Sequence, residues 1–214
     1  MNLHAIRPRV FGAFRRRRMA MFYRTFQPSA QTRLLDIGGG PNTWIDESRI
    51  DEIIPVTLVN TQYPDPAVVA DARFTAIYAD ATSLPLDDAS FDIVFSNSVI
   101  EHMTSWERQQ EFAAEARRVG KKLWIQTPAR CFPIEPHLLA PFFQYWPKHL
   151  QRSLARYCTL WGILTQPDAT AIDEMISDIR LLTYSEFRKL FPDCLIVRER
   201  YLGLTKSYIA ISNG

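Results

Sequence analysis

The stretch LLDIGGGPNTW, residues 34–44, decides the fold that this sequence predicts. A short apolar run ends in Asp36 and Ile37, and the three consecutive glycines Gly38, Gly39 and Gly40 follow it. This order is typical of a buried strand that leads into a tight turn, because glycine adopts backbone angles that other residues avoid and lets a ligand approach the main chain. Pro41 then suits the first position of a helix.

Strands and helices alternate after this turn. Thr104, with Glu107 three residues later, forms a capping-box pattern for a helix over 104–119, and Gly120 supplies a stop. Alternation of this kind predicts a mostly parallel sheet with right-handed crossovers. The expected strands after the first (RLLDI, 33–37) are VTLVN (56–60), FTAIYA (74–79), FDIVFSN (91–97) and KKLWIQT (121–127).

Residues 183–212 predict a helix and two more strands. The helix covers 184–191, with Thr183 or Ser185 as its N-cap, and the strands cover 194–202 and 206–212. Only a few residues around Gly203 link these strands, and so short a link joins antiparallel neighbours. We therefore expect an α/β, Rossmann-like, doubly wound sheet of seven strands that is mostly parallel and has a C-terminal antiparallel strand.

Composition divides the chain into two parts and an insertion. Residues 1–30 hold seven arginines and no acidic residue, which leaves 18 basic against 23 acidic residues in the remainder. We interpret 1–30 as a separate basic arm, a weak amphipathic helix at best, and 31–214 as the main domain. Within that domain, 131–180 is rich in aromatic residues and prolines, and we expect an inserted helical cap there.

Overall composition favours a soluble, cytoplasmic protein. Hydrophobic residues make up 47% and charged residues 22% of the chain, and no apolar run is long enough to span a bilayer. The basic N-terminus has no apolar segment after it, so it does not predict a secretory signal. The cysteines Cys131, Cys158 and Cys194 lie far apart and away from the histidines, which predicts neither a disulfide framework nor a metal site.

Two motifs in order resemble one enzyme family. The first is Asp36-Ile37-Gly38-Gly39-Gly40, and the second runs from Asp80-Ala81 to Val94 within IYADATSLPLDDASFDIVFSNSVIEHM (77–103). Together they resemble the class I S-adenosylmethionine-dependent methyltransferases, specifically the bacterial type 11 group. The resemblance covers about residues 31–128. It implies that the chain is an S-adenosyl-L-methionine-dependent methyltransferase.

The resemblance also implies a set of residues that bind the cofactor S-adenosyl-L-methionine. Asp36 and the glycines Gly38, Gly39 and Gly40 would hold its methionine portion. Asp80 would accept a hydrogen bond from the adenine amino group, beside the backbone of Ala81. The methyl-donor site would be lined by Asn97 and Ser98 at the end of the fourth strand.

The sequence departs from the family pattern at two places. Asn60 stands where the family has an acidic residue that accepts hydrogen bonds from the ribose, and an amide binds more weakly than a charged carboxylate. Pro41-Asn42 stands where many relatives have another glycine. NAD is the competing cofactor, but its G-x-G-x-x-G fingerprint would need glycine at Thr43, and the acidic ribose ligand is absent.

Candidates for a general base follow the fourth and fifth strands. Glu101 and His102 follow the fourth, and Glu135 and His137 follow the fifth. A histidine titrates near pH 6.5 and accepts a proton near neutrality, so His137 is the favoured base, with Glu135 and His102 as further catalytic candidates. The competing interpretations are that Glu101-His102 caps or packs a helix and that Glu135 and His137 lie in a solvated loop.

Substrate and partners are less defined by the sequence. Arg130 is a candidate ligand for an anionic acceptor group. Trp146 and Phe142 belong either to a packed helical lid or to an apolar channel for a lipid or aromatic acceptor. The acceptor is expected to be a small or lipid-linked molecule, and the alternative is a non-catalytic binding or scaffold protein with the same fold. The basic arm is either a solvated tail or a peripheral contact with anionic membrane; a nucleic-acid partner is disfavoured.

Overall fold

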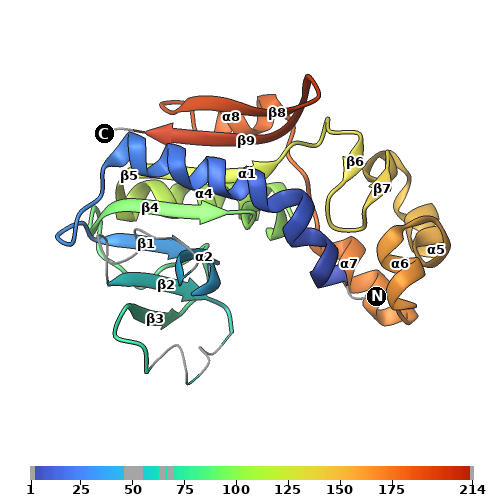
Figure 1. The fold of residues 1–214 in the computed structure, drawn as a ribbon, viewed down its shortest axis with the longest axis horizontal. Helices are drawn as coiled ribbons and strands as arrows, with labels where there is room; N and C mark the ends of the chain where they lie inside the picture. Colours follow the sequence, from blue (N-terminus) through green and yellow to red (C-terminus); the bar gives the residue numbers. More distant parts are fainter. Residues whose placement is uncertain (1–2, 46–54, 63–65, 67–69, 213–214) are drawn as a thin grey trace.

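The computed structural model describes residues 3–45, 55–62, 66 and 70–212, with residues 3–11 and 45 described by their backbone alone. Its centre is a seven-stranded sheet with the order β3-β2-β1-β4-β5-β9-β8 (Figure 1). The strands are β1 (Leu34–Ile37), β2 (Val56–Asn60), β3 (Phe74–Tyr78), β4 (Phe91–Asn97), β5 (Gly120–Pro128), β8 (Leu195–Tyr201) and β9 (Leu204–Ser212).

Strand directions confirm the expected fold class. The first five strands pair in parallel, whereas β9 pairs antiparallel with both β5 and β8. The chain leaves β1 toward β2 on one side, and β4 lies on its other side. Strand order therefore reverses at β1, and in open α/β sheets ligands bind beyond the carboxyl ends of the strands at such a point.

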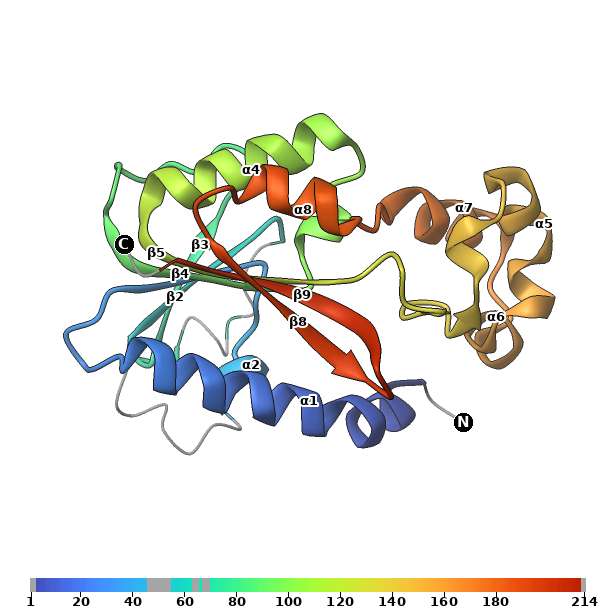
Figure 2. The same ribbon diagram turned by 90° about the horizontal axis from the view of Figure 1, so that it is seen from above.

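Helices cover both faces of the sheet. Figure 2 shows α1 (Leu3–Phe26) and α2 (Asn42–Ile45) on one face and α4 (Trp106–Val119) and α8 (Tyr184–Leu190) on the other. The N-cap of α8 is Thr183, one of the two predicted candidates, within a full capping box. For α4 the predicted cap was wrong by one residue, because the hydroxyl of Ser105, not Thr104, accepts the hydrogen bond from the backbone N–H of Arg108.

The N-terminal segment differs from the expected separate arm. Residues 3–26 form one helix, and its second half belongs to the core of the sheet's face. Phe22 is fully buried and contacts Trp44, Phe95 and Trp124 edge-on at centroid distances of 6.0, 5.3 and 5.7 Å. The sequence did not predict this packing, because the apolar stripe of the helix is short and arginines precede and interrupt it along the chain. The stripe consists of Met19, Phe22, Tyr23 and Phe26.

The insertion 131–180 lies beyond the carboxyl ends of the parallel strands (Figure 1). It begins with a hairpin that the sequence did not predict, β6 (Ile134–Glu135) and β7 (Ala140–Pro141), and a short 3-10 helix, η3 (Phe143–Tyr145). Three helices follow: α5 (Lys148–Cys158), α6 (Leu160–Thr165) and α7 (Ala169–Asp178). It has an apolar core of its own, made by Leu138, Ala140, Phe143, Ala155, Ile172 and Ile176.

No helix among the described residues is both long and apolar enough to cross a membrane.

Candidate functional site

The glycine turn after β1 has a backbone that only glycine permits. Gly38 has a φ of +74°, and a Cβ there would lie 2.6 Å from the side chain of Val99. A Cβ on Gly39 would lie 1.8 Å from the carboxylate of Asp36. A Cβ on Gly40 would meet no atom within 4 Å, so open space lies beside this residue. The main chain of the turn is thus accessible to a ligand at the point where strand order reverses.

Asp36 lies beneath this turn rather than on its surface. The residue is 0% exposed, and its Oδ2 accepts a hydrogen bond of 2.8 Å from the indole N–H of Trp44. Its Oδ1 has no hydrogen-bond partner among the described residues. Burial disfavours the charged carboxylate and raises the pKa of Asp36 to about 7, against a smaller opposite effect of the Trp44 bond. Asp36 therefore shapes the turn from below.

Asn60, at the end of β2, is tied to the same turn. Its side-chain amide donates a hydrogen bond of 2.7 Å to the carbonyl of Gly39. The sequence predicted a direct ribose contact, and this bond leaves the amide oxygen Oδ1 for such a contact. Asn60 is half-buried beside the glycine turn.

Asp80 follows β3 and carries three hydrogen bonds. Its Oδ1 accepts from the backbone N–H and the hydroxyl of Thr82, at 2.9 and 2.8 Å. Its Oδ2 accepts from the guanidinium of Arg108 at 2.8 Å, and this bond is the largest cause of a lowered pKa of Asp80. The carboxylate is charged and exposed. Ala81 next to it is buried in the core, so that only its backbone is available to a ligand.

The end of β4 faces a large cavity. Asn97 is half-buried, and Ser98 has a φ of +60° and donates from its hydroxyl to Oε1 of Gln126 at 3.0 Å. Ser98 and Gln126 line a cavity of about 470 Å³. Its walls are mostly apolar and come from α1, β5, the hairpin β6–β7 and the ends of β8 and β9. Its lining residues include Phe14, Arg18, Phe132, Ile134, Tyr201 and Lys206.

Two histidines form part of the cavity wall, and each is paired with a carboxylate. Nδ1 of His137 lies 2.7 Å from Oε1 of Glu135, whose Oε2 accepts from the backbone N–H of His137 at 2.8 Å. Nδ1 of His102 lies 2.7 Å from Oδ2 of Asp178. The two imidazole rings meet edge-on, 5.2 Å apart. The sequence candidates His137 and His102 thus lie on one wall of the cavity, and Glu135 contacts His137 without lining that cavity.

Glu101 lies behind these histidines and is fully buried. Its Oε2 accepts a hydrogen bond of 2.9 Å from the hydroxyl of Thr127, and its Oε1 has no partner within the described part of the chain. Burial raises the pKa of the Glu101 carboxyl, and the neighbouring His137 and His102 and the hydrogen bond from Thr127 oppose this rise in part.

A family model described as a methyltransferase domain, Methyltransf_11, matches residues 35–123, a range that contains the glycine turn, Asn60, Asp80 and Ser98. These residues, less than half of the chain, form a methyltransferase domain similar to the class I type 11 group.

Solved structures share the fold of this methyltransferase domain. Phosphoethanolamine N-methyltransferase 2 of Haemonchus contortus is 18% identical, with a TM-score of 0.55 over 86% of this chain and 38% of that one. The 1,6-didemethyltoxoflavin N1-methyltransferase of Burkholderia thailandensis is 15% identical, with a TM-score of 0.54 over 92% and 76%. Both were crystallised with S-adenosylhomocysteine.

A third similar structure is the [4+2]-cyclase SpnF, which is 17% identical, with a TM-score of 0.53 over 85% of this chain. This chain spans 57% of the cyclase and 38% of the N-methyltransferase. A search of curated proteins found no match. At these identities the comparisons establish the fold, and the cyclase shows that one fold serves different reactions.

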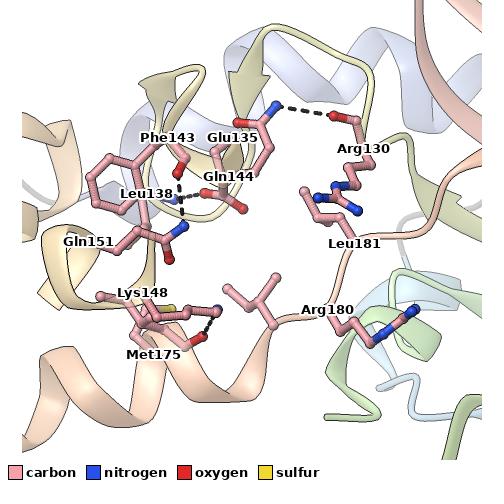
Figure 3. Close-up of a pocket in the computed structure, with 12 residues that line it drawn as sticks. Arg130, Glu135, Leu138, Phe143, Gln144, Lys148, Gln151, Met175, Arg180 and Leu181 are labelled. Carbon is pink, nitrogen blue, oxygen red and sulfur yellow. Dashed lines mark hydrogen bonds between the residues drawn. The ribbon is translucent and has the colours of Figure 1, made fainter. Parts of the chain in front are cut away.

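A second, smaller cavity of about 190 Å³ lies within the insertion and is closed by the flanking residues Arg130 and Leu181. Figure 3 shows Arg130, Glu135 and Lys148 around it. Lys148 donates to the carbonyl of Ile176 at 2.5 Å, and burial lowers its pKa. Arg130 is exposed, with its guanidinium 5.8 Å from the ring centre of Tyr145.

The predicted substrate residues of the insertion lie elsewhere. Phe142 is 58% exposed, and Trp146 packs on Phe143 with ring centres 5.2 Å apart. Neither residue lines the two cavities described above. The cavity beside Ser98 instead has residues that the sequence did not single out, above all Phe14 and Lys206. They lie almost 200 positions apart in the chain, and no local sequence pattern links them.

Proposed function

We propose that the chain binds S-adenosyl-L-methionine at the glycine turn and transfers its methyl group to a small or lipid-linked acceptor in the 470 Å³ cavity. One observation carries the proposal. The main chain of the glycine turn is accessible at the switch point of the sheet, and Ser98, at the end of the neighbouring strand β4, lines a mostly apolar cavity. The family match supports the same reaction class.

The residues around the glycine turn fit an adenosyl ligand. Open space lies beside Gly40, where a ligand can contact the main chain. The amide oxygen of Asn60 suits a ribose hydroxyl as hydrogen-bond donor. The charged carboxylate of Asp80 is exposed and can accept from an adenine amino group, although Arg108 shares it.

Bound S-adenosyl-L-methionine supplies a methyl group already activated on a sulfonium, so the chain's main task is to position the acceptor in line with it. The apolar cavity walls exclude water around the acceptor. A hydroxyl acceptor also has to lose a proton, and His137 lines the cavity where it can take that proton. Glu135, which contacts Nδ1, fixes the ring and stabilises its protonated form.

Calorimetry with S-adenosyl-L-methionine and its demethylated product tests the proposal. Gly40→Leu fills the open space beside the turn without placing a side chain against protein atoms. We expect this variant to fold normally and to lose at least about 100-fold in affinity, because ligand and side chain compete for one space. Gly12→Ala, in α1, is the matched control and should bind like the wild type.

The main alternative is a non-catalytic or differently reactive protein on the same fold. The cyclase among the similar structures makes this alternative concrete. Absence of binding at millimolar S-adenosyl-L-methionine would favour a scaffold role and overturn the proposal. Binding of NAD in its place would indicate the oxidoreductase alternative.

A lipid-linked acceptor would bring the protein to a membrane, and we include contact of α1 with anionic lipid in the proposal. Arg16 and Arg17 are exposed on this helix, whereas Arg18 is buried against Glu199. Each exposed arginine near an anionic surface contributes about 1 kcal/mol. A smaller fraction of the double variant Arg16→Glu/Arg17→Glu should therefore sediment with phosphatidylserine vesicles than of the wild type. Equal fractions of variant and wild type would contradict the contact.

A further inference from the structure

The geometry points to a binding site for one divalent transition-metal ion, formed by Glu101, His102 and His137. The three residues each offer one ligand atom, and these atoms all lie within 4.8 Å of one another. Around a tetrahedral Zn²⁺, ligand atoms are about 3.3 Å apart, so small side-chain rotations close the set. The sequence predicted no metal, because these residues come from two separate segments.

The buried carboxylate of Glu101 gives the first independent support. Its Oε1 is buried and accepts no hydrogen bond from any described residue, although Oε2 is held by Thr127. A buried carboxylate oxygen without a partner is costly, and a cation relieves this cost. Glu101 is thus positioned by Thr127 through one oxygen and offers the other.

The orientation of the histidines gives the second support. Nδ1 of His102 contacts Asp178, and Nδ1 of His137 contacts Glu135, both at 2.7 Å. Metal-binding histidines usually donate their second ring N–H to a carboxylate, which fixes the tautomer and leaves the other nitrogen to coordinate. The same arrangement occurs here twice within one cluster. In the proposed site we assign Nε2 of each ring as the coordinating atom, because Nδ1 contacts a carboxylate.

The donor set defines the class of ion. Two imidazoles and one carboxylate suit Zn²⁺, Co²⁺, Mn²⁺ or Fe²⁺, whereas Mg²⁺ and Ca²⁺ prefer oxygen ligands. Three protein ligands leave at least one coordination position open. Since His102 and His137 both line the 470 Å³ cavity, that position faces the cavity and suits an oxygen donor of a bound molecule.

The role of the ion toward an acceptor rests on the proposed function, but binding of the ion does not. With a metal bound, His137 is a ligand and no longer the proton acceptor. Turnover that depends on added metal would then distinguish the two roles.

The test is metal binding by the full chain after dialysis against a chelator. Titration with Co²⁺, followed by visible absorption, and with Zn²⁺, followed by calorimetry, should give one ion per chain near neutral pH. Glu101→Gln and His102→Asn should weaken binding at least about tenfold, the smallest effect usual even for residues behind the ligands. His149→Ala, which removes an exposed histidine on α5, is the matched control and should bind normally.

Circular dichroism of each variant establishes that it is folded. Wild-type protein that binds neither ion at 100-fold molar excess would overturn the site, and so would equal affinities of the triad variants and His149→Ala. If Glu101→Gln fails to fold, His102→Asn decides the matter, because His102 is partly exposed. Binding of S-adenosyl-L-methionine is measured separately, so failure of one proposal does not imply failure of the other.

Discussion

Asp36 makes folding stability depend on pH. Its carboxyl is fully buried, and burial raises its pKa from the ordinary 3.8 to about 7. The folded protein therefore holds this proton more tightly than the unfolded chain. The stability that this proton contributes is fully present below the unfolded pKa, falls as pH rises toward the folded pKa of about 7, and is gone above it.

Asp36→Asn should remove this pH dependence. The neutral amide can still accept the hydrogen bond from Trp44 without titrating. Relative to the wild type, the variant should gain up to about 3 kcal/mol of unfolding free energy between pH 5 and pH 8, since each pH unit below the folded pKa is worth about 1.4 kcal/mol. Urea unfolding of both proteins at the two pH values measures the gain. If the difference in unfolding free energy between variant and wild type is the same at both pH values, the carboxyl is not protonated in the folded protein.

Arg108 competes for the carboxylate that the proposed adenine contact requires. Its bond to Asp80 is exposed, and exposed ion pairs contribute at most about 1 kcal/mol. Arg108→Ala should therefore raise the affinity for S-adenosyl-L-methionine, by up to about fivefold. Arg117→Ala, which breaks a comparable exposed pair with Asp193, is the control for calorimetry. A weaker affinity in Arg108→Ala would mean that the arginine itself contacts the ligand.

At the scale of the element, α1 is a structural part of the domain. Phe22→Ala should lower the free energy of unfolding by about 3–5 kcal/mol, because the cavity it leaves is enclosed by Trp44, Phe95 and Trp124. Phe142→Ala removes the same atoms from a side chain that is 58% exposed, and it should cost far less. Similar costs in urea unfolding would indicate that α1 is detached in solution.

The strands could be predicted from the sequence, and the packing of α1 could not. A buried parallel strand is a continuous apolar run, and β4 begins and ends where FDIVFSN does. In α1, the apolar residues 19, 22, 23 and 26 follow the helical period but occupy only two turns. Four arginines precede them, and the ion pair that buries Arg18 involves Glu199 on β8. That partner lies 181 positions away, beyond any local pattern.

At the scale of the molecule, the site is assembled from distant segments. The glycine turn and the ends of β2, β3 and β4 could be placed from sequence, because carboxyl ends of parallel strands meet at one edge. The positions of His102 and His137 on the cavity wall could not be predicted, since they depend on the insertion returning toward the sheet. His102 meets Asp178 over 76 positions, and the backbone N–H of Arg180 bonds the carbonyl of Glu101 at 2.7 Å. Tertiary folding, not spacing, joins these groups.

Binding at the glycine turn should stabilise the whole chain, because Asp36 and the strand ends belong both to the turn and to the buried core. A ligand at 100 times its dissociation constant stabilises the folded state by about 2.7 kcal/mol. For a chain of this size, that corresponds to a rise in Tm of about 5–11 °C. Thermal unfolding with and without S-adenosylhomocysteine measures the rise, which Gly40→Leu should abolish and Gly12→Ala should retain. If the rise in Tm is equal in Gly40→Leu and in the wild type, the ligand binds away from the glycine turn.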